Sequence, residues 1–278
     1  MVAACLDSGG PTPPPAVAYD LLRSGNRDIY RAAIDGSDTV RLTTDTADER
    51  HPTSAAGIIV FISNRDGNDE LYAMPAAGGA ARRLTFTAAN EADPALSPDG
   101  TRLAYTRDDG GLPRLWVANA DGSGAVRVTD SLDFAGAVDV SPAWAPGSDR
   151  VAFVSTTSGS ARIYALTLAT MAITPVLSDT APDVEPAWSP DGSILAFTSG
   201  ANGGARLALL TLATHGVTLI TDASASSGES TWLPDGRLVF LVLGASPALA
   251  WLDPGQPAAV HGIDVGAGTP GHPAAIRP

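Results

Sequence analysis

Apolar and polar residues alternate along most of the chain with the two-residue period of a β-strand, and no segment keeps the 3.6-residue spacing of an amphipathic helix. The apolar stretches are short and are separated by clusters rich in Gly and Pro, of which the chain has 29 and 22. Five of these stretches follow the same kind of turn and span residues 58–62, 103–106, 151–154, 194–198 and 238–242. The pattern predicts a turn-rich, all-β protein.

A turn motif recurs through the chain at an almost constant spacing. Its two fullest copies read Asp-Pro-Ala-Leu-Ser-Pro-Asp-Gly at 93–100 and Glu-Pro-Ala-Trp-Ser-Pro-Asp-Gly at 185–192. Weaker copies place the position of the first Pro at Pro52, Pro142, Ser230 and Pro273, so successive copies lie 42 to 48 residues apart. Because Pro presets φ, Asp bonds to nearby backbone and Gly accepts a positive φ, each Pro-Asp-Gly predicts a tight turn.

Each repeat carries the same succession of elements. The turn is followed by an apolar strand, a polar hairpin, a second strand with a pair such as Leu71 and Tyr72, and a short strand that ends in a pair such as Leu84 and Thr85. With the strand that contains the first Pro of the motif, this gives four antiparallel strands per repeat. Four-stranded units of this length around a ring are typical of a β-propeller, and residues 16–278 provide six of them.

The two ends of this region complement each other. The first unit begins at Val17 without a Pro-containing strand, whereas residues 272–277 have the pattern of that strand alone. We therefore expect residues 272–277 to pair beside residues 17–22 and to close the ring by hydrogen bonds. Three tryptophans recur 44 residues apart at one place in the repeat, which predicts packing between neighbouring blades: Trp144, Trp188 and Trp232.

The repeat resembles a known one. Units that read Pro-Ala-Trp-Ser-Pro-Asp-Gly, an apolar strand, Ser-Asn-Arg-Asp-Gly-Asn, Leu-Tyr and Arg-Leu-Thr are similar to the TolB-type propeller repeat of bacterial periplasmic and secreted proteins. The resemblance covers residues 16–278 and implies a six-bladed propeller with the Pro-containing strand innermost. TolB has an additional N-terminal α/β domain, and the resemblance does not extend to it. Prolyl-oligopeptidase-like peptidases also carry related propellers.

Residues 1–15 have a different character from the repeats. Val2 to Cys5 resemble the lipobox of bacterial lipoproteins, and the Gly- and Pro-rich residues 6–15 are typical of a tether. We expect lipidation at Cys5 and a location in the periplasm or at the cell surface, lipid-anchored or secreted. The alternative is that Cys5 lies in an ordinary exposed tail.

Composition removes several function classes. The chain has 30 acidic and 17 basic residues, all of the latter Arg, and a net charge of -13, so nucleic acid is not an expected partner. The single Cys excludes an internal disulfide, and zinc-ligand spacings are absent. Neither a Gly-x-Ser-x-Gly nucleophile motif nor a run of 18 apolar residues occurs, so we predict no catalytic residues and no membrane span.

Polar residues gather beside the first Pro of each repeat. One set immediately precedes it, namely His51, Asp93, Ser141, Glu185, Glu229 and His272, and a second set lies two residues earlier, namely Glu49, Glu91, Asp139 and Asp183. On the innermost strand, both sets are expected to surround one mouth of the central channel. Two carboxylates about 8 Å apart repel by roughly 2 kcal/mol, so a cation or a basic partner group would stabilise this ring.

Three of these residues suggest a metal site. His51 and His272 fall in adjacent blades beside Asp93, and such a set could hold a divalent metal ion in the channel. The alternative is that the ring faces a water-filled funnel and caps loop backbone.

The sequence thus predicts a monomeric, non-catalytic binding or scaffold propeller of the bacterial cell envelope, with a protein or small ligand at the channel mouth. Two alternatives remain open at this point. One is a metal-dependent polysaccharide lyase or hydrolase acting in the funnel, and the other is the detached propeller module of a prolyl-oligopeptidase-like peptidase.

Overall fold

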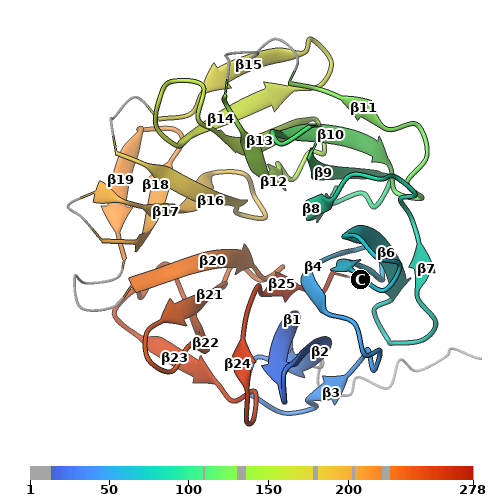
Figure 1. Cartoon of the computed structure of the whole chain (residues 1–278). Coiled ribbons are helices and arrows are strands. Elements are labelled where there is room, and N and C mark those ends of the chain that lie inside the picture. Colours follow the sequence, from blue (N-terminus) through green and yellow to red (C-terminus); the bar gives the residue numbers. More distant parts are fainter. Residues whose placement is uncertain are drawn as a thin grey trace, which may run out of the picture.

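Six antiparallel sheets, five of them four-stranded and one five-stranded, surround a central channel in the computed structural model. The structure describes residues 14–108, 110–129, 136–177, 181–201, 204–220 and 226–277. Figure 1 shows the blades arranged in a ring, with the first strand of each repeat nearest the axis. The predicted six-bladed propeller is therefore confirmed. Among the described residues, no helix is long and apolar enough to cross a membrane.

The blades follow the chain from blade 1 to blade 6. Blade 1 contains β1 (Ala16–Arg23), β2 (Asn26–Ala33) and β3 (Val40–Arg41). Blades 2 and 3 contain β4 (Glu49–Ala55), β5 (Ile58–Ser63), β6 (Glu70–Pro75), β7 (Arg82–Arg83), β8 (Glu91–Leu96), β9 (Arg102–Asp108), β10 (Pro113–Asn119) and β11 (Val126–Arg127). Blades 4 and 5 contain β12 (Asp139–Trp144), β13 (Arg150–Ser155), β14 (Arg162–Thr167), β15 (Ala172–Pro175), β16 (Asp183–Trp188), β17 (Ile194–Ser199), β18 (Arg206–Thr211) and β19 (Gly216–Leu219). Blade 6 contains β20 (Ser226–Trp232), β21 (Leu238–Leu243), β22 (Ala248–Leu252) and β23 (Val260–Ile263).

The ring is closed by the C-terminal segment of the chain. Two short strands, β24 (Thr269–Pro270) and β25 (Ala274–Ala275), pair with β1 and complete blade 1 (Figure 1). Val17 faces Ala275 and Leu21 faces Pro270 in the register. The expected closure is confirmed, with one difference. Two strands of two residues each, β24 and β25, replace one continuous strand, and residues 271–273 between them belong to neither.

The repeated turn motif is held by its own side chains. In blade 3 the Ser97 hydroxyl donates to Asp99 at 2.5 Å and accepts the backbone N–H of Arg102 at 2.9 Å. Gly100 adopts φ +69°, a left-handed conformation that favours glycine. The same hydroxyl and carboxylate contacts recur at Ser189 and Asp191, which explains why Ser, Asp and Gly recur together.

Aromatic side chains at equivalent positions form the core between blades. One residue in the second strand of every blade is at most 1% exposed: Tyr19, Phe61, Tyr105, Phe153, Phe197 and Phe240. Trp144 and Trp232 are also buried, and each indole N–H donates to a carbonyl of the preceding blade, at Ala95 and Ala187. The predicted role of the tryptophans in packing between blades is confirmed for these two contacts.

Each innermost strand of blades 2 to 6 contains a β-bulge just before the position of the motif's first Pro, which is Ser230 in blade 6. The register shifts lie between Arg50 and Thr53 in β4 and at matching places in β8, β12, β16 and β20. The residue before this position takes a positive φ of 48° to 56° in all five blades: His51, Asp93, Ser141, Glu185 and Glu229. The bulge turns these residues away from the regular alternation of the strand and toward the channel.

Candidate functional site

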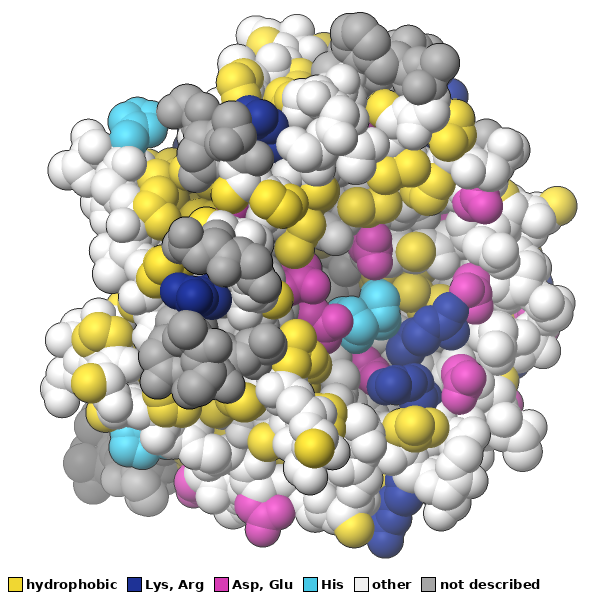
Figure 2. Space-filling model, turned by 60° about the vertical axis from the view of Figure 1, so that its left-hand side comes forward, with side chains coloured by type: hydrophobic (Ala, Val, Ile, Leu, Met, Phe, Trp, Pro, Cys, Tyr) yellow, Lys and Arg dark blue, Asp and Glu magenta, His cyan; other side chains and the backbone are white. Residues whose placement is uncertain are grey.

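The six residues that precede the motif's Pro line one funnel at the mouth of the channel. The funnel has a volume of about 360 Å³, and its polar wall consists of His51, Asp93, Ser141, Glu185, Glu229 and His272, with Ser230 beside them. Figure 2 shows histidine side chains at the centre of this face, with acidic side chains and arginines around them. The ring expected from the repeat spacing therefore does come together.

Backbone N–H groups hold the carboxylates of the ring in place. Asp93 accepts the N–H of Ser141 from the next blade at 3.2 Å, and Glu185 accepts that of Glu229 at 2.7 Å. At the junction of blades 1 and 2, Asp20 accepts the N–H of His51 at 3.4 Å. In each case a carboxylate of one blade accepts the N–H of the following blade, and this occurs between blades 1 and 2, 3 and 4, and 5 and 6. These bonds orient the acidic side chains and link the blades.

The two histidine rings lie side by side between carboxylates, with an angle of 34° between their planes. His272 is 2.8 Å from Glu229 through Nε2 and 3.4 Å from Asp20 through Nδ1. His51 is 3.3 Å from Asp93 through Nδ1. The centroids of the two imidazole rings are 3.2 Å apart.

These contacts change the charge of the cluster. Burial favours the neutral imidazole, but Asp20 and Glu229 outweigh it and raise the pKa of His272 to about 9. Burial also favours the neutral acid at Asp20 and Asp93, yet the pKa of each stays below its usual value because of His272 and His51 respectively. His272 therefore carries a positive charge at neutral pH and partly neutralises the ring.

The residues present do not fit the expected metal site at His51, Asp93 and His272. The described part of the chain contains no group of three His, Cys, Asp or Glu side chains arranged to hold a metal ion. Both ring nitrogens of His272 and Nδ1 of His51 already face carboxylates.

The second acidic set lies away from the channel. The structure buries these side chains between strands, each with at most 1% exposed: Glu49, Glu91, Asp139 and Asp183. The bulge explains the difference, because an extra residue interrupts the two-residue alternation and places the two sets on different faces. Glu49 contacts Ser63 and Arg65, and Asp139 lies 3.6 Å from Arg114.

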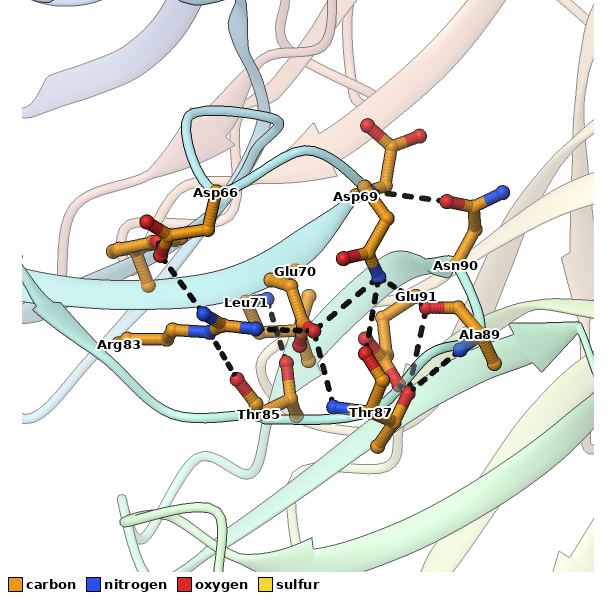
Figure 3. Close-up of polar contacts among 12 residues, drawn as sticks. Asp66, Asp69, Glu70, Leu71, Arg83, Thr85, Thr87, Ala89, Asn90 and Glu91 are labelled. Atoms are coloured by element: carbon orange, nitrogen blue, oxygen red, sulfur yellow. Dashed lines mark hydrogen bonds and ion pairs between the residues drawn. The ribbon is translucent and has the colours of Figure 1, made fainter.

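Glu91 takes part in a buried carboxyl pair between blades 2 and 3 (Figure 3). Glu70 accepts bonds from Arg83 at 2.6 Å and from the Thr87 N–H at 3.0 Å, and Thr87 donates its hydroxyl to Glu91 at 2.7 Å. Burial, together with the nearby Glu70 carboxylate, raises the pKa of Glu91 to about 7, whereas its hydrogen bonds lower the pKa of Glu70. Glu91 is therefore the partner that keeps its proton up to about neutral pH.

Three charged residues of the mouth were not expected from the repeat. Asp20 is fully buried, and both Arg27 and His272 pair with it, while Arg50 pairs with Asp69 nearby. A side recess of about 400 Å³ is lined by Asp20, Arg27 and Arg50 and shares His51 with the funnel. The sequence did contain a signal for Asp20, because the equivalent strand position carries no acidic residue in the other blades. Those residues are Ile62, Thr106, Val154, Thr198 and Leu241.

Comparison with protein families now identifies the architecture. The model of the TolB beta propeller domain matches residues 14–133 and 114–245, which together are most of the chain. This chain belongs to the TolB β-propeller domain family.

Individual TolB proteins match shorter parts of the chain. A TolB homolog from Chlorobium luteolum is 33% identical over 40% of this chain and 34% of its own length. A Tol-Pal system protein TolB from Anaeromyxobacter dehalogenans is 41% identical over 31% of this chain and 19% of its own. The chain thus matches about a third or less of these relatives. The crystal structure of TolB from Acinetobacter baumannii has a TM-score of 0.83, covering 95% of this chain and 67% of that one, and its 18% identity shows a shared fold alone.

Replacement of the charged histidine in this TolB-type propeller should make stability less dependent on pH. The raised pKa of His272 means that its ion pairs stabilise the fold fully below the unfolded value near 6.5 and lose this effect as pH rises through about 9. We expect His272→Gln to lower the free energy of unfolding by roughly 2 kcal/mol at mildly acidic pH, less at about pH 10. Urea titrations across this range, with His215→Gln at an exposed turn as the control, measure the effect. An equal loss at both ends of the range would contradict an ionic role.

Glu91→Gln should raise the free energy of unfolding, whereas His272→Gln should lower it. Glu91 keeps its proton in the folded protein up to about pH 7, whereas its pKa in the unfolded chain is near 4.5. The free energy of unfolding of the wild type therefore falls as pH rises from about 4.5 to about 7, and this loss persists at higher pH. The amide imitates the protonated acid, so the variant should gain roughly 2 kcal/mol over the wild type above neutrality and little near pH 4.5. Glu70→Gln is the matched control and should destabilise, because it weakens the bonds that Glu70 accepts from Arg83, the Thr87 N–H and the Asn68 amide. Thermal melts that show Glu91→Gln destabilised at every pH would contradict the assignment.

Proposed function

We propose that this chain is a non-catalytic binding module of the bacterial cell envelope and that a partner protein docks at its funnel. The observation that carries the proposal is the convergence of six equivalent positions, one from each blade, on a single polar funnel of about 360 Å³. Family membership supports it, since matched relatives are named as TolB proteins of the Tol-Pal system. That this chain binds the same kind of partner as those relatives is part of the proposal.

The charges of the funnel favour a basic group on the partner. His272 and Asp93 are already paired within the ring, but Glu185 uses one oxygen to accept from Thr198 and the Glu229 N–H and forms no ion pair with a described residue. One Glu229 oxygen is buried without a hydrogen-bond partner. These two neighbouring carboxylates suit a Lys or Arg side chain, which would restore the charge balance of the ring.

No cluster in the described part of the chain favours the enzymatic alternatives. The funnel side chains are held by one another and by backbone N–H groups rather than arranged as a metal-binding set. A lyase or hydrolase that depends on a metal in the funnel gains no specific support from this geometry.

A lipid anchor at Cys5 is the second part of the proposal. Cys5 lies outside the described residues, and its support is the lipobox-like Val2 to Cys5 followed by a Gly- and Pro-rich segment. A tether of about ten residues extends up to roughly 30 Å, which would leave the funnel free to meet a partner.

Site-specific photo-crosslinking in the native host tests the docking proposal. A photoreactive residue in place of Ser141 lies in the funnel wall, where only the backbone of Ser141 bonds to Asp93, so the substitution preserves that contact. We expect a discrete adduct with one envelope protein, and its yield should fall in a Glu185→Gln background. The same residue at position 86, where Phe86 is 74% exposed on the outside, is the control. Identical adducts from both positions, or none from the funnel, would contradict the proposal.

Cys5→Ser tests the anchor separately. The wild-type chain expressed behind a complete lipoprotein signal should gain the mass of acyl chains and fractionate with membranes, because a thioether-linked lipid supplies the apolar area that the acidic chain lacks. The Ser variant should move to the soluble fraction. An unmodified Cys5, or a variant that stays in the membrane fraction, would rule the anchor out without affecting the funnel.

A further inference from the structure

The side recess next to the funnel is formed by residues of blades 6, 1 and 2 and has a volume of about 400 Å³. Among the residues that it does not share with the funnel are two arginines, Arg27 and Arg50. Figure 2 shows arginine side chains beside the histidines at the centre of this face. Blade 6 and the closing segment add apolar side chains to the lining, namely Leu241, Leu243, Pro247 and Pro270. The recess therefore combines cationic hydrogen-bond donors with apolar surface.

Both arginines are accessible to a ligand. The exposed fraction of the side chain is 31% for Arg27 and 26% for Arg50. Arg27 pairs with Asp20, whose side chain is fully buried, and Arg50 pairs with Asp69, which does not line the recess. A buried carboxylate and one outside the lining offer nothing to an incoming group. The arginines are therefore the charged groups that the recess adds to the wall it shares with the funnel.

Each guanidinium also has hydrogen-bonding capacity left. Arg27 donates to Asp20 through Nη1, and Arg50 donates to Asp69 through Nη2. The other terminal nitrogen of each arginine forms no hydrogen bond with a described residue. A guanidinium carries five N–H donors in a planar fork, so both arginines can still donate to an acceptor from outside. Such donors match a carboxylate, which accepts several hydrogen bonds in one plane.

We propose that the side recess accepts an acidic residue of the protein that docks at the funnel. The carboxylate of that residue binds Arg27 and Arg50, and an adjoining apolar side chain covers Leu243, which is 39% exposed. The apolar lining favours a protein residue over an inorganic anion, because it gives such an anion no further donor.

This inference rests on the proposed docking at the funnel and specifies the partner further. The contact surface of the partner carries charges of both signs, with a basic group at Glu185 in the funnel and an acidic group at the recess. Because the recess occurs at one place on the ring, the two charges also fix where each part of the partner lies.

Photo-crosslinking from the recess, with the funnel as reference, tests the inference. In the native host, a photoreactive residue replaces Leu243 in one version of the full chain and Ser141 in another. Both should capture the same protein, and peptide mass spectrometry should place the adduct from position 243 next to an Asp or Glu of that protein. Arg50→Gln should lower the yield of this adduct about tenfold, because it removes a charged donor to the carboxylate.

The controls separate the recess from the funnel. Arg82→Gln, on the outer strand β7, removes an exposed arginine elsewhere and should leave both adducts unchanged. Arg27→Gln is a second test, and thermal melts check that each variant folds. If Arg27→Gln does not fold, because buried Asp20 loses its pairing, Arg50→Gln alone decides.

Three results overturn the recess and leave the funnel proposal intact. They are an adduct from position 141 without one from position 243, an adduct from position 243 far from any acidic residue of the partner, and a yield at position 243 that Arg50→Gln does not change. The absence of adducts from both positions overturns both proposals.

Discussion

The pairing of β24 and β25 with β1 is the contact on which the ring and its funnel depend. Without it, blade 1 would lack its innermost strand and the six blades would form an open arc with two unpaired edges. The same segment carries His272 into the funnel. A few residues therefore connect the stability of the ring with the chemistry of the funnel.

The charges along the inner strands are distributed by the bulge before each Pro. Carboxylates before the bulge are buried, and their neighbours are arginine and hydroxyl groups, as at Glu49, or they keep a proton, as Glu91 does up to about neutral pH. Those beyond the bulge face the funnel, where N–H groups of the next blade hold them. One backbone irregularity, repeated in five blades, thus separates structural acids from acids that are available to a ligand.

The repeat spacing predicted the blade number, the closure and the six funnel positions because each depends on local turn chemistry repeated at a fixed interval. It did not predict the burial of Glu49 and Glu91, since strict alternation assigns residues two apart to one face and a bulge is not visible in the pattern. The pairing of His272 with Asp20 was also missed, because it joins residues some 250 positions apart in sequence through the ring itself. Such contacts follow from the closed topology and not from the repeat.

The cluster of Asp20, His51 and His272 occurs at one junction of an otherwise repeating ring. A mouth built from six near-equal blades would offer a partner six nearly equivalent rotational settings, about 60° apart, each with similar affinity. The two adjacent imidazoles and the buried Asp20 carboxylate that His272 contacts make the junction of blades 1 and 2 chemically unlike the other five. A docked protein would therefore have one preferred rotational setting about the channel axis. The pseudosymmetric ring would hold its partner in one orientation relative to the N-terminal end of the chain.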